Sequence, residues 1–356
     1  KCSMSDRTAE TAGAVAENRA VLSRILTSTG PLLALVLLML IGLLMSDSFL
    51  TYENLTNVFT RSAIIGIIAI GATFVITAGG LDLSVGSLSA LIAGLTIMAM
   101  NALADWSNTG WLLVVAGIAI SLLLGASAGF LNGAMVVKGR VEAFIVTLGT
   151  MGIFRALVTW LSDGGAISLN FSLRDAVRPI YYNAVLGIPI PVIVLIVIAI
   201  AAELVLWRTR FGRHTAAIGS NRNVARFSAI PVDGVRIATY VIQGICVAIA
   251  TVIYVPRLGS ATPSTGLMWE LEAIASVIIG GTALAGGYGR IWGTIVGVLI
   301  LGFIANILNL TGVVSPYLNG AFQGVIIISL ATSHLRSRKL SSRHPSTHRH
   351  RVALEW

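Results

Sequence analysis

The chain has 356 residues and little charge: Asp, Glu, Lys and Arg make up only 11% of it, whereas 56% is hydrophobic and the mean hydropathy is +0.88. Soluble domains carry about 25% charged residues. The composition therefore argues against a soluble protein and predicts several membrane-spanning segments. The 37 glycines lie within apolar runs, which is typical of membrane helices rather than of flexible linkers.

Signs of enzymatic or metal chemistry are also missing. The two cysteines, Cys2 and Cys246, lie in a polar tail and in an apolar run, so we expect no structural disulfide, and no zinc-binding spacing occurs. No phosphate-binding G-x-x-x-x-G-K-[S/T] run is present. The predicted spans contain no credible acid–base pair or nucleophile. We therefore expect no catalytic residue, no metal site and no cofactor bound by this chain.

Apolar segments along the chain predict an all-α polytopic membrane protein with about ten transmembrane helices, since one span requires about 20 mostly apolar residues. The eighth segment is short and rich in glycine, which favours a broken or re-entrant helix. The predicted spans are Gly30–Met45, Ser62–Ala78, Gly86–Ala104, Trp111–Val137, Ala143–Leu161, Ala184–Trp207, Ile237–Val255, Ala273–Ala285, Ile291–Leu310 and Gly320–His334.

The net charge of +9 is distributed unevenly. With a cytoplasmic N-terminus, nearly all Lys and Arg residues fall in cytoplasmic segments, where positive charge accumulates. This bias predicts cytoplasmic termini and an even number of spans, and it accounts for the basic charge without a nucleic-acid partner. We expect an N-terminal tail at 1–29, a transmembrane domain at 30–335 and a basic, histidine-containing tail at 336–356 beside anionic lipid. The outer loops hold only Arg61, Arg174, Arg178 and Arg257.

The longest cytoplasmic loop, residues 208–236, predicts a short amphipathic helix that lies across the cytoplasmic side. Asn221 is placed to cap the start of this helix, and Pro231 is placed to end it. The apolar stripe of the predicted helix consists of Ala216, Ile218, Val224, Phe227 and Ile230.

The segment Gly79–Gly86 joins the second and third predicted spans. Its first two glycines allow a tight turn, and Ser84 is placed to cap the next helix. Asp82 is an acidic residue beside membrane depth, which marks a candidate functional site. The alternative is a plain cytoplasmic turn with Asp82 near the lipid headgroups. The segment Gly280–Gly287 repeats Gly, Gly, Leu and Gly in the same register, either by chance or as part of an internal repeat.

Other polar or motif-like residues have structural explanations. Arg155 and Glu203 lie near the ends of predicted spans, so we expect both to snorkel towards the nearest interface, although pathway lining or pairing with another helix is the alternative. The run Gly125–Gly129 matches the hydrolase pattern G-x-S-x-G, but that motif requires a strand before it. Within an apolar helix, these small residues instead predict close helix packing.

Several stretches in the same order resemble the ribose/xylose/arabinose-type family of ABC permeases. The resemblance covers roughly Gly30 to Leu335. It is carried by Ile76–Gly86, Phe144–Thr150, Thr209–Gly212 with Ala217–Asn221, and Leu271–Thr282 followed by Gly286 and Gly287.

This resemblance implies the membrane-spanning subunit of a simple-sugar importer in a bacterial inner membrane. Such a permease works as a dimer, by alternating access, with a binding protein outside and a separate ATPase that binds ATP and Mg²⁺. The loop helix Ala217–Ile230 would dock on the ATPase. The family usually has a pair of small residues near Val224 and Ala225 and glycine at the position of Ala229, so docking here differs slightly or the ATPase partner differs.

We therefore predict two groups of functional residues. The candidates for a gate or translocation site are Gly79, Gly80, Asp82, Ser84, Gly86, Gly280 and Gly281. The candidates for coupling to the ATPase are Ala217, Gly219, Asn221, Arg222, Ala225, Arg226 and Ile230.

Two other classes of protein remain open from the residues. An ion-coupled secondary transporter of a small polar solute requires acidic residues at mid-membrane, whereas Asp82 and Glu203 lie near span ends. An intramembrane serine protease built on Ser127 requires a histidine at membrane depth, and the span interiors contain none. The sequence leaves the sugar, and the choice between two identical permeases and two related ones, undetermined.

Overall fold

The computed structural model describes residues 30–104, 109–312, 318, 320–321 and 324–325. In these residues, seven helices are long and apolar enough to cross a membrane, which confirms an all-α polytopic membrane protein. Both tails and most of the predicted span Gly320–His334 lie outside the described residues, so the count of ten stays a prediction. The seven helices are α2 (Tyr52–Thr77), α3 (Val85–Ala104), α4 (Gly110–Val137), α5 (Ala143–Leu161), α8 (Ile190–Arg208), α11 (Val232–Leu258) and α13 (Ile291–Thr311).

Shorter elements connect these helices. A shorter apolar helix, Gly30–Met45, precedes α2. The strands form two small antiparallel pairs. Strand β1 pairs with β4, which is distant in sequence, and β2 pairs with its neighbour β3. The short elements are α6 (Phe171–Val177), α7 (Pro179–Tyr182), α9 (Arg210–Ser220), α10 (Arg222–Phe227), α12 (Trp269–Ile279), β1 (Ile167–Ser168), β2 (Ala184–Val185), β3 (Ile188–Pro189) and β4 (Ser260–Ala261).

The predicted boundaries are right for the helix Gly30–Met45 and for α5, lie within one residue for α3, α4 and α13, and differ more for α2, α8 and α11. Helix α2 begins at Tyr52 rather than at Ser62, because Thr51 caps it by accepting a hydrogen bond from the Asn54 backbone. The polar residues of its first turns had hidden this start. The predicted span from Ala184 begins instead as the hairpin of β2 and β3, and α8 starts only at Ile190.

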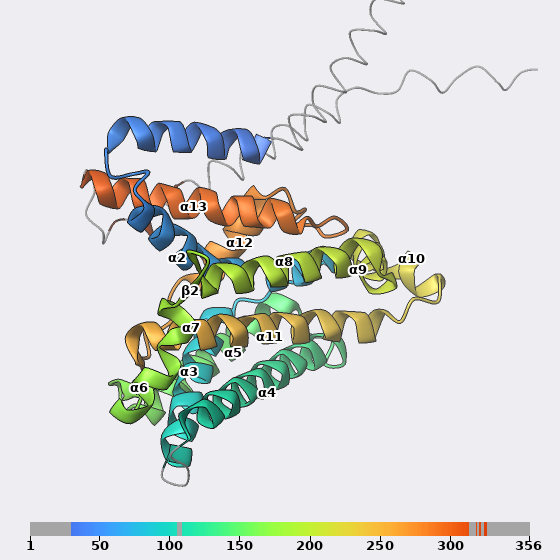
Figure 1. Cartoon of the computed structure of the whole chain (residues 1–356). Coiled ribbons are helices and arrows are strands. Elements are labelled where there is room, and N and C mark those ends of the chain that lie inside the picture. Colours follow the sequence, from blue (N-terminus) through green and yellow to red (C-terminus); the bar gives the residue numbers. More distant parts are fainter. Residues whose placement is uncertain (1–29, 105–108, 313–317, 319, 322–323, 326–356) are drawn as a thin grey trace, which may run out of the picture.

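Helix α12 confirms the expectation of a short eighth segment, because it has only 11 residues and ends at Ile279. The predicted continuation to Ala285 is a turn instead. Figure 1 shows α8, α11 and α13 running across the view, with α9 and α10 at one end and α6 and α7 at the other. We call these the α10 end and the α6 end of the molecule.

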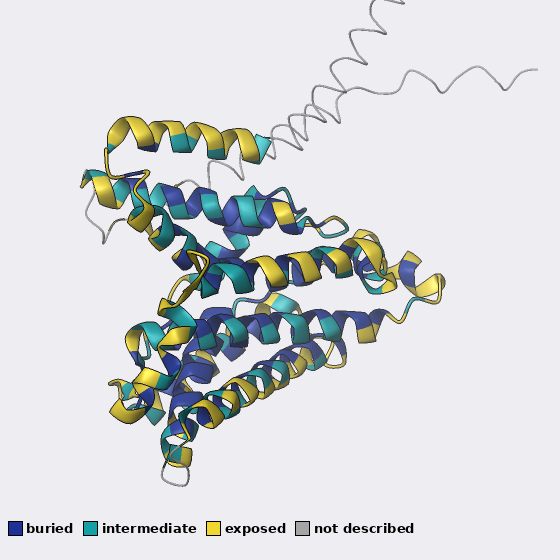
Figure 2. Cartoon of the chain, in the orientation of Figure 1, coloured by how far each residue is buried: buried dark blue, intermediate teal, exposed yellow. Residues whose placement is uncertain are grey.

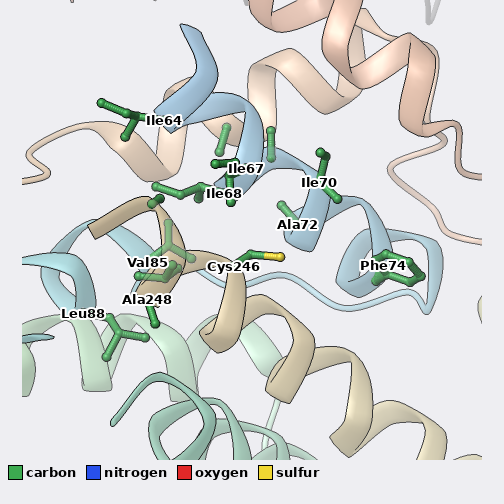
Figure 3. Close-up of a cluster of buried hydrophobic side chains, with 14 of the residues drawn as sticks. Ile64, Ile67, Ile68, Ile70, Ala72, Phe74, Val85, Leu88, Cys246 and Ala248 are labelled. Carbon is green, nitrogen blue, oxygen red and sulfur yellow. The ribbon is translucent and has the colours of Figure 1, made fainter. Parts of the chain in front are cut away.

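Helices α2 and α11 form the centre of the core. Helix α2 is buried along most of its second half, whereas α4 and α8 expose many apolar side chains, as expected for helices that face lipid (Figure 2). Cys246 of α11 lies among buried aliphatic residues of α2, which include Ile67 and Ile68 (Figure 3). It is a free, buried cysteine.

Glycines let α4 pack closely on α11. A Cβ atom added to Gly125 would overlap the backbone oxygen of Gly244, and one added to Gly129 would overlap that of Tyr240. Helices approach this closely only through such small residues. The packing interpretation of Gly125–Gly129 is therefore confirmed, and the hydrolase pattern lies within helix α4 with no strand before it.

The connections that follow α2 and α11 share a pattern that the sequence interpretation missed. Gly79, Ser84 and Gly86 follow α2 with the same spacing as Gly259, Ser264 and Gly266 after α11. Gly79 and Gly259 both have a positive φ, of 74° and 64°. Gly86 and Gly266 contact each other, because a Cβ atom on either would overlap the backbone oxygen of the other. The connection between α2 and α3 and the connection between α11 and α12 are thus similar, and they meet at Gly86 and Gly266.

Candidate functional site

The segment Ala78–Ser84 begins with a glycine turn that ends α2. The Gly79 N–H donates to the Ile76 oxygen and the Gly80 N–H donates to the Val75 oxygen, both at 2.9 Å. These bonds form the pattern with which helices commonly end in a left-handed glycine. A Cβ atom on Gly80 would lie 2.8 Å from the Tyr240 hydroxyl, so a larger residue here would press on α11.

Asp82 is buried within the protein in this segment, with 7% of its surface exposed. Its carboxylate accepts hydrogen bonds from the Ser84 backbone at 2.9 Å and from the Ser84 hydroxyl at 2.6 Å. Asn132 of α4 donates to the Ser84 hydroxyl at 2.9 Å. Burial raises the pKa of the Asp82 carboxyl, and the bonds from Ser84 oppose that rise.

Ser84 directly precedes α3, as predicted, but its hydroxyl donates to Asp82. The Ser84 backbone oxygen accepts the first helical bond, from Leu88 at 2.8 Å. Tyr240 of α11 donates to the Leu81 oxygen at 3.2 Å. The segment is therefore held by α4 and α11 together, through Asn132 and Tyr240, two residues that the sequence interpretation had not singled out.

Gly86 lies where the connection before α12 crosses the start of α3. A Cβ atom on Gly86 would overlap the Gly266 oxygen and a carboxylate oxygen of Glu270. Arg155 of α5 donates to the backbone oxygens of Pro263 and, at 2.7 Å, of Thr265. Arg155 thus binds this connection and does not snorkel to the interface, because carbonyl oxygens within its reach satisfy its guanidinium.

The turn after α12 contains the remaining gate candidates. The Gly281 N–H donates to the Ile278 oxygen, and Gly281 has a positive φ of 89°. Gly281 is therefore the counterpart of Gly79, and the repeat register that aligned Gly79 with Gly280 is wrong by one residue. Gly280 packs against Gly293 of α13, where a Cβ atom would overlap the backbone.

Four glycines bring the two predicted groups of site residues together at the α10 end. Gly219, near the end of α9, packs against the Thr77 oxygen at the end of α2 and against the Gly287 backbone, leaving no room for a Cβ atom. The Gly287 N–H donates to the Thr77 oxygen at 2.9 Å. A Cβ atom on Gly286 would lie 3.0 Å from both Gly79 and Gly219. We call Gly79, Gly219, Gly286 and Gly287 the glycine junction.

The predicted loop helix Ala217–Ile230 is in fact two helices, α9 and α10. Asn221 separates them with an extended backbone, φ −159° and ψ 106°. Its side-chain oxygen accepts hydrogen bonds from the backbones of Asn223 at 3.0 Å and Val224 at 3.1 Å. The predicted cap is therefore confirmed, and it starts a second helix. Helix α10 ends at Phe227, before Pro231.

The predicted apolar stripe also divides between two environments. Ile218 and Ala225 are buried against the start of α11, with Ile230 packed beside them. Val224 and Phe227 instead expose 58% and 92% of their surface at the tip of α10. The tip of α10 therefore presents an exposed apolar patch, formed by Val224 and Phe227, and patches of this kind often mark interaction sites.

The other coupling candidates surround this tip. Asn221, Arg222 and Arg226 are exposed, and Arg226 forms an exposed ion pair with Asp233 at 3.2 Å. Ala217 and Gly219 are half-buried in α9. Ala229 has a positive φ of 56°, a conformation that favours glycine. The alanine therefore strains the turn between α10 and α11.

Glu203 lies near the end of α8. Its carboxylate faces the backbone of Ile291 and the charge of Arg290, at the start of α13. A carboxylate is stabilised at the N-terminal end of a helix, which explains this position. This contact agrees with the alternative of pairing with another helix, and snorkelling to the interface stays a prediction. The described residues hold no group of three or more His, Cys, Asp or Glu side chains suited to a metal.

This geometry defines a class of protein: a multi-pass membrane protein in which the short helices α9 and α10 lie at one end, and α9 contacts the end of the buried helix α2. The chain belongs to the family described as branched-chain amino acid transport system / permease component, which matches residues 54–331. It is therefore a transport component and not an enzyme. The bacterial relatives below indicate the inner membrane.

The relatives match over most of their length. The chain is 36% identical to the ribose import permease protein RbsC of Haemophilus influenzae, over 90% of this chain and 97% of that protein. It is 40% identical to the ribose import permease protein RbsC of Escherichia coli, over 80% of this chain and 87% of that protein. The L-arabinose transport system permease protein AraH of Escherichia coli is 31% identical, over 86% of this chain and 90% of that protein.

Proposed function

We propose that the chain is the membrane-spanning subunit of an ATP-driven importer that moves a pentose or hexose delivered by an external binding protein. The observation that carries the proposal is the similarity to ribose and arabinose permeases over most of the chain. The lack of a phosphate-binding loop in the sequence supports a separate ATPase that binds ATP and Mg²⁺.

The tip of α10 docks on that ATPase. Phe227 and Val224 supply an exposed apolar contact, and Arg222 supplies charge beside them. Aromatic residues and arginines contribute most of the binding energy in many interfaces. This assignment places the α10 end in the cytoplasm, in agreement with the orientation predicted from the basic residues.

The glycine junction transmits movement of the tip to the spans. Gly219 contacts both the end of α2 and the turn after α12, so a displacement of α9 pushes on both. The segment Ala78–Ser84 leads directly from the junction to Asp82 and α3. Close-packed contacts pass on displacements because they leave no space to absorb them. Asp82 and its neighbours thus form the cytoplasmic gate of an alternating-access cycle, in which two copies or two related permeases pair in the membrane.

Reconstitution tests this function. The chain, its genetically adjacent ATPase and its binding protein are placed in proteoliposomes, and uptake of radiolabelled ribose, arabinose, allose and glucose is measured with and without ATP. We expect uptake of one sugar that requires all three proteins. Uptake that needs no ATPase and collapses with an ionophore would support an ion-coupled transporter instead.

Docking is tested separately by the double substitution Arg222→Glu and Arg226→Glu. We expect it to prevent co-purification with the ATPase, because it reverses the charge of two exposed residues beside the apolar tip. A double variant that still co-purifies and transports normally would refute docking at α10.

A further inference from the structure

A cavity of about 530 Å³ lies between α2, α12 and α13. Its lining comes from the first half of α2 and the second half of α13, so it extends from the α6 end towards the middle of the membrane domain. The polar residues of its lining include Asn57, Arg61, Ser62, Glu272, Ser276 and Asn306.

Polar contacts link the helices that surround this cavity. Asn54 and Asn306 exchange two hydrogen bonds, at 3.0 and 2.7 Å, which tie α2 to α13. Gly302 lies opposite Ser62, and a Cβ atom there would press on the Ser62 hydroxyl. That hydroxyl is buried and has no hydrogen-bond partner in the described part of the chain. A buried hydroxyl normally has a partner, and Ser62 belongs to the lining of the cavity.

A second cavity shows that such a space is not a general property of these helices. It lies between α3, α4 and α11 and measures only about 30 Å³. Its polar residues Thr96 and Ser121 satisfy each other through a hydrogen bond of 2.8 Å. The cavity beside α2 is therefore distinguished by its size and by the number of polar residues in its lining.

The chemistry of the lining limits what can fill the cavity. Ionisable and amide groups within a membrane face water or polar partners, because contact with hydrocarbon is costly. Arg61 and Glu272 carry opposite charges, so the lining favours a neutral polar solute over an ion. Amide and hydroxyl side chains both donate and accept hydrogen bonds, as sugar hydroxyls do. The volume falls within the range of about 300–1,000 Å³ that is typical of small-molecule sites.

We propose that this cavity, which we call the α2–α13 pocket, binds a neutral polyhydroxylated solute and so gives the permease its own sugar site. The identity of that solute as the transported sugar rests on the proposed function. The pocket itself does not depend on it, since its hydration and ligand binding can be measured without transport.

Cysteine labelling tests the pocket in the full chain. Cys2→Ser removes the cysteine of the tail, while Cys246 is buried and stays. Asn57→Cys and Ser276→Cys then place single thiols in the pocket lining. We expect a membrane-impermeant thiol reagent to label both from the α6 side, and one of the four radiolabelled sugars, added unlabelled, to protect them. A matched Thr56→Cys on α2, outside the lining, should gain no protection.

Three outcomes separate the claims. If neither lining thiol is labelled, the pocket is dry and the proposal is overturned. If both are labelled and no sugar protects them, the pocket is hydrated but does not bind a polyol, which also overturns it. Protection without ATP-driven uptake would instead keep the pocket and reject the proposed function.

The sugar concentration needed for protection supplies a second readout. Ser62→Ala removes the unpaired hydroxyl, and losing one such bond to a sugar weakens binding by up to about tenfold. We expect the half-saturating concentration of sugar for protection of Asn57→Cys to rise by up to that factor, with unchanged labelling in the absence of sugar. An unchanged half-saturating concentration would exclude Ser62 from the site.

Discussion

Gly219 of the glycine junction and the tip of α10 lie close together along the chain but differ in how they are packed. At the junction, Gly219 meets the backbones of Thr77 and Gly287 with no side chain between them. At the tip, Phe227 exposes 92% of its surface. The first surface is completed within the chain, whereas the second is exposed and is where we propose that the ATPase docks. In our proposal, the tip of α10 receives the movement of the ATPase and the glycine junction passes it on to the spans.

The largest effect is expected at the junction. Gly219→Ala adds a Cβ atom that overlaps the Thr77 oxygen, and because backbone cannot yield as a side chain can, α9 must shift. Overpacking costs about 1–3 kcal/mol. We expect sugar uptake to fall to background. The control is Gly234→Ala at the start of α11, where nothing lies within 4 Å of the added atom. Wild-type uptake by the Gly219 variant would contradict transmission through the junction.

Asp82 should be nearly as sensitive, because it is the polar end of the segment that the junction moves. Asp82→Ala leaves the Ser84 N–H and hydroxyl without their acceptor, a cost of about 1–3 kcal/mol. We expect uptake to be lost while the permease still assembles with its ATPase, as judged by co-purification. Normal transport in this variant would remove Asp82 from the gate.

An intermediate effect is expected at the tip. Phe227→Ala removes an exposed apolar anchor and should weaken binding of the ATPase by about tenfold, since an anchor of an interface contributes over 1 kcal/mol. The melting temperature of the isolated permease should not change. Phe171→Ala provides the control, because Phe171 exposes 83% of its surface at the α6 end. Equal losses of ATPase binding in both variants would show that the tip is not specific.

The smallest effect is expected beside the tip. Ala229→Gly should stabilise the permease by about 1 kcal/mol, because Ala229 has a φ of 56° and an L-residue with a side chain is strained there. Thermal unfolding in detergent measures the gain. Ser228→Gly, at a φ of −84°, should instead destabilise the protein. A lower melting temperature for the Ala229 variant would show that no strain is stored in this turn.

The sequence predicted the apolar helices well and their polar ends poorly. Helix α5 has its predicted bounds, whereas the start of α2 was hidden by Asn54, Asn57 and Arg61. Hydropathy is averaged over a window of residues, so a stretch of helix that contains several polar residues facing a cavity is assigned to a loop. The same residues turn out to line the α2–α13 pocket, so the error marked a functional feature.

The candidate site was predicted as two separate groups, and only the structure joins them. The glycine pattern located Asp82 and Gly79, and Asn221 located the start of a helix in the loop. The contact of Gly219 with Thr77 depends on how distant helices pack, which no local pattern encodes. One signal was present in the sequence. Gly79, Ser84 and Gly86 have the same spacing as Gly259, Ser264 and Gly266, and this match could have revealed the similarity of the connections that follow α2 and α11.

The most direct test of transmission is the number of sugar molecules imported per ATP hydrolysed by the reconstituted transporter. With Gly219→Ala, we predict that ATP hydrolysis continues and that import stops, so the ratio falls towards zero. With Phe227→Ala, hydrolysis stimulated by the loaded binding protein and import should fall together at an unchanged ratio. A normal ratio for Gly219→Ala, or a loss of ATP hydrolysis in that variant equal to its loss of import, would contradict the account.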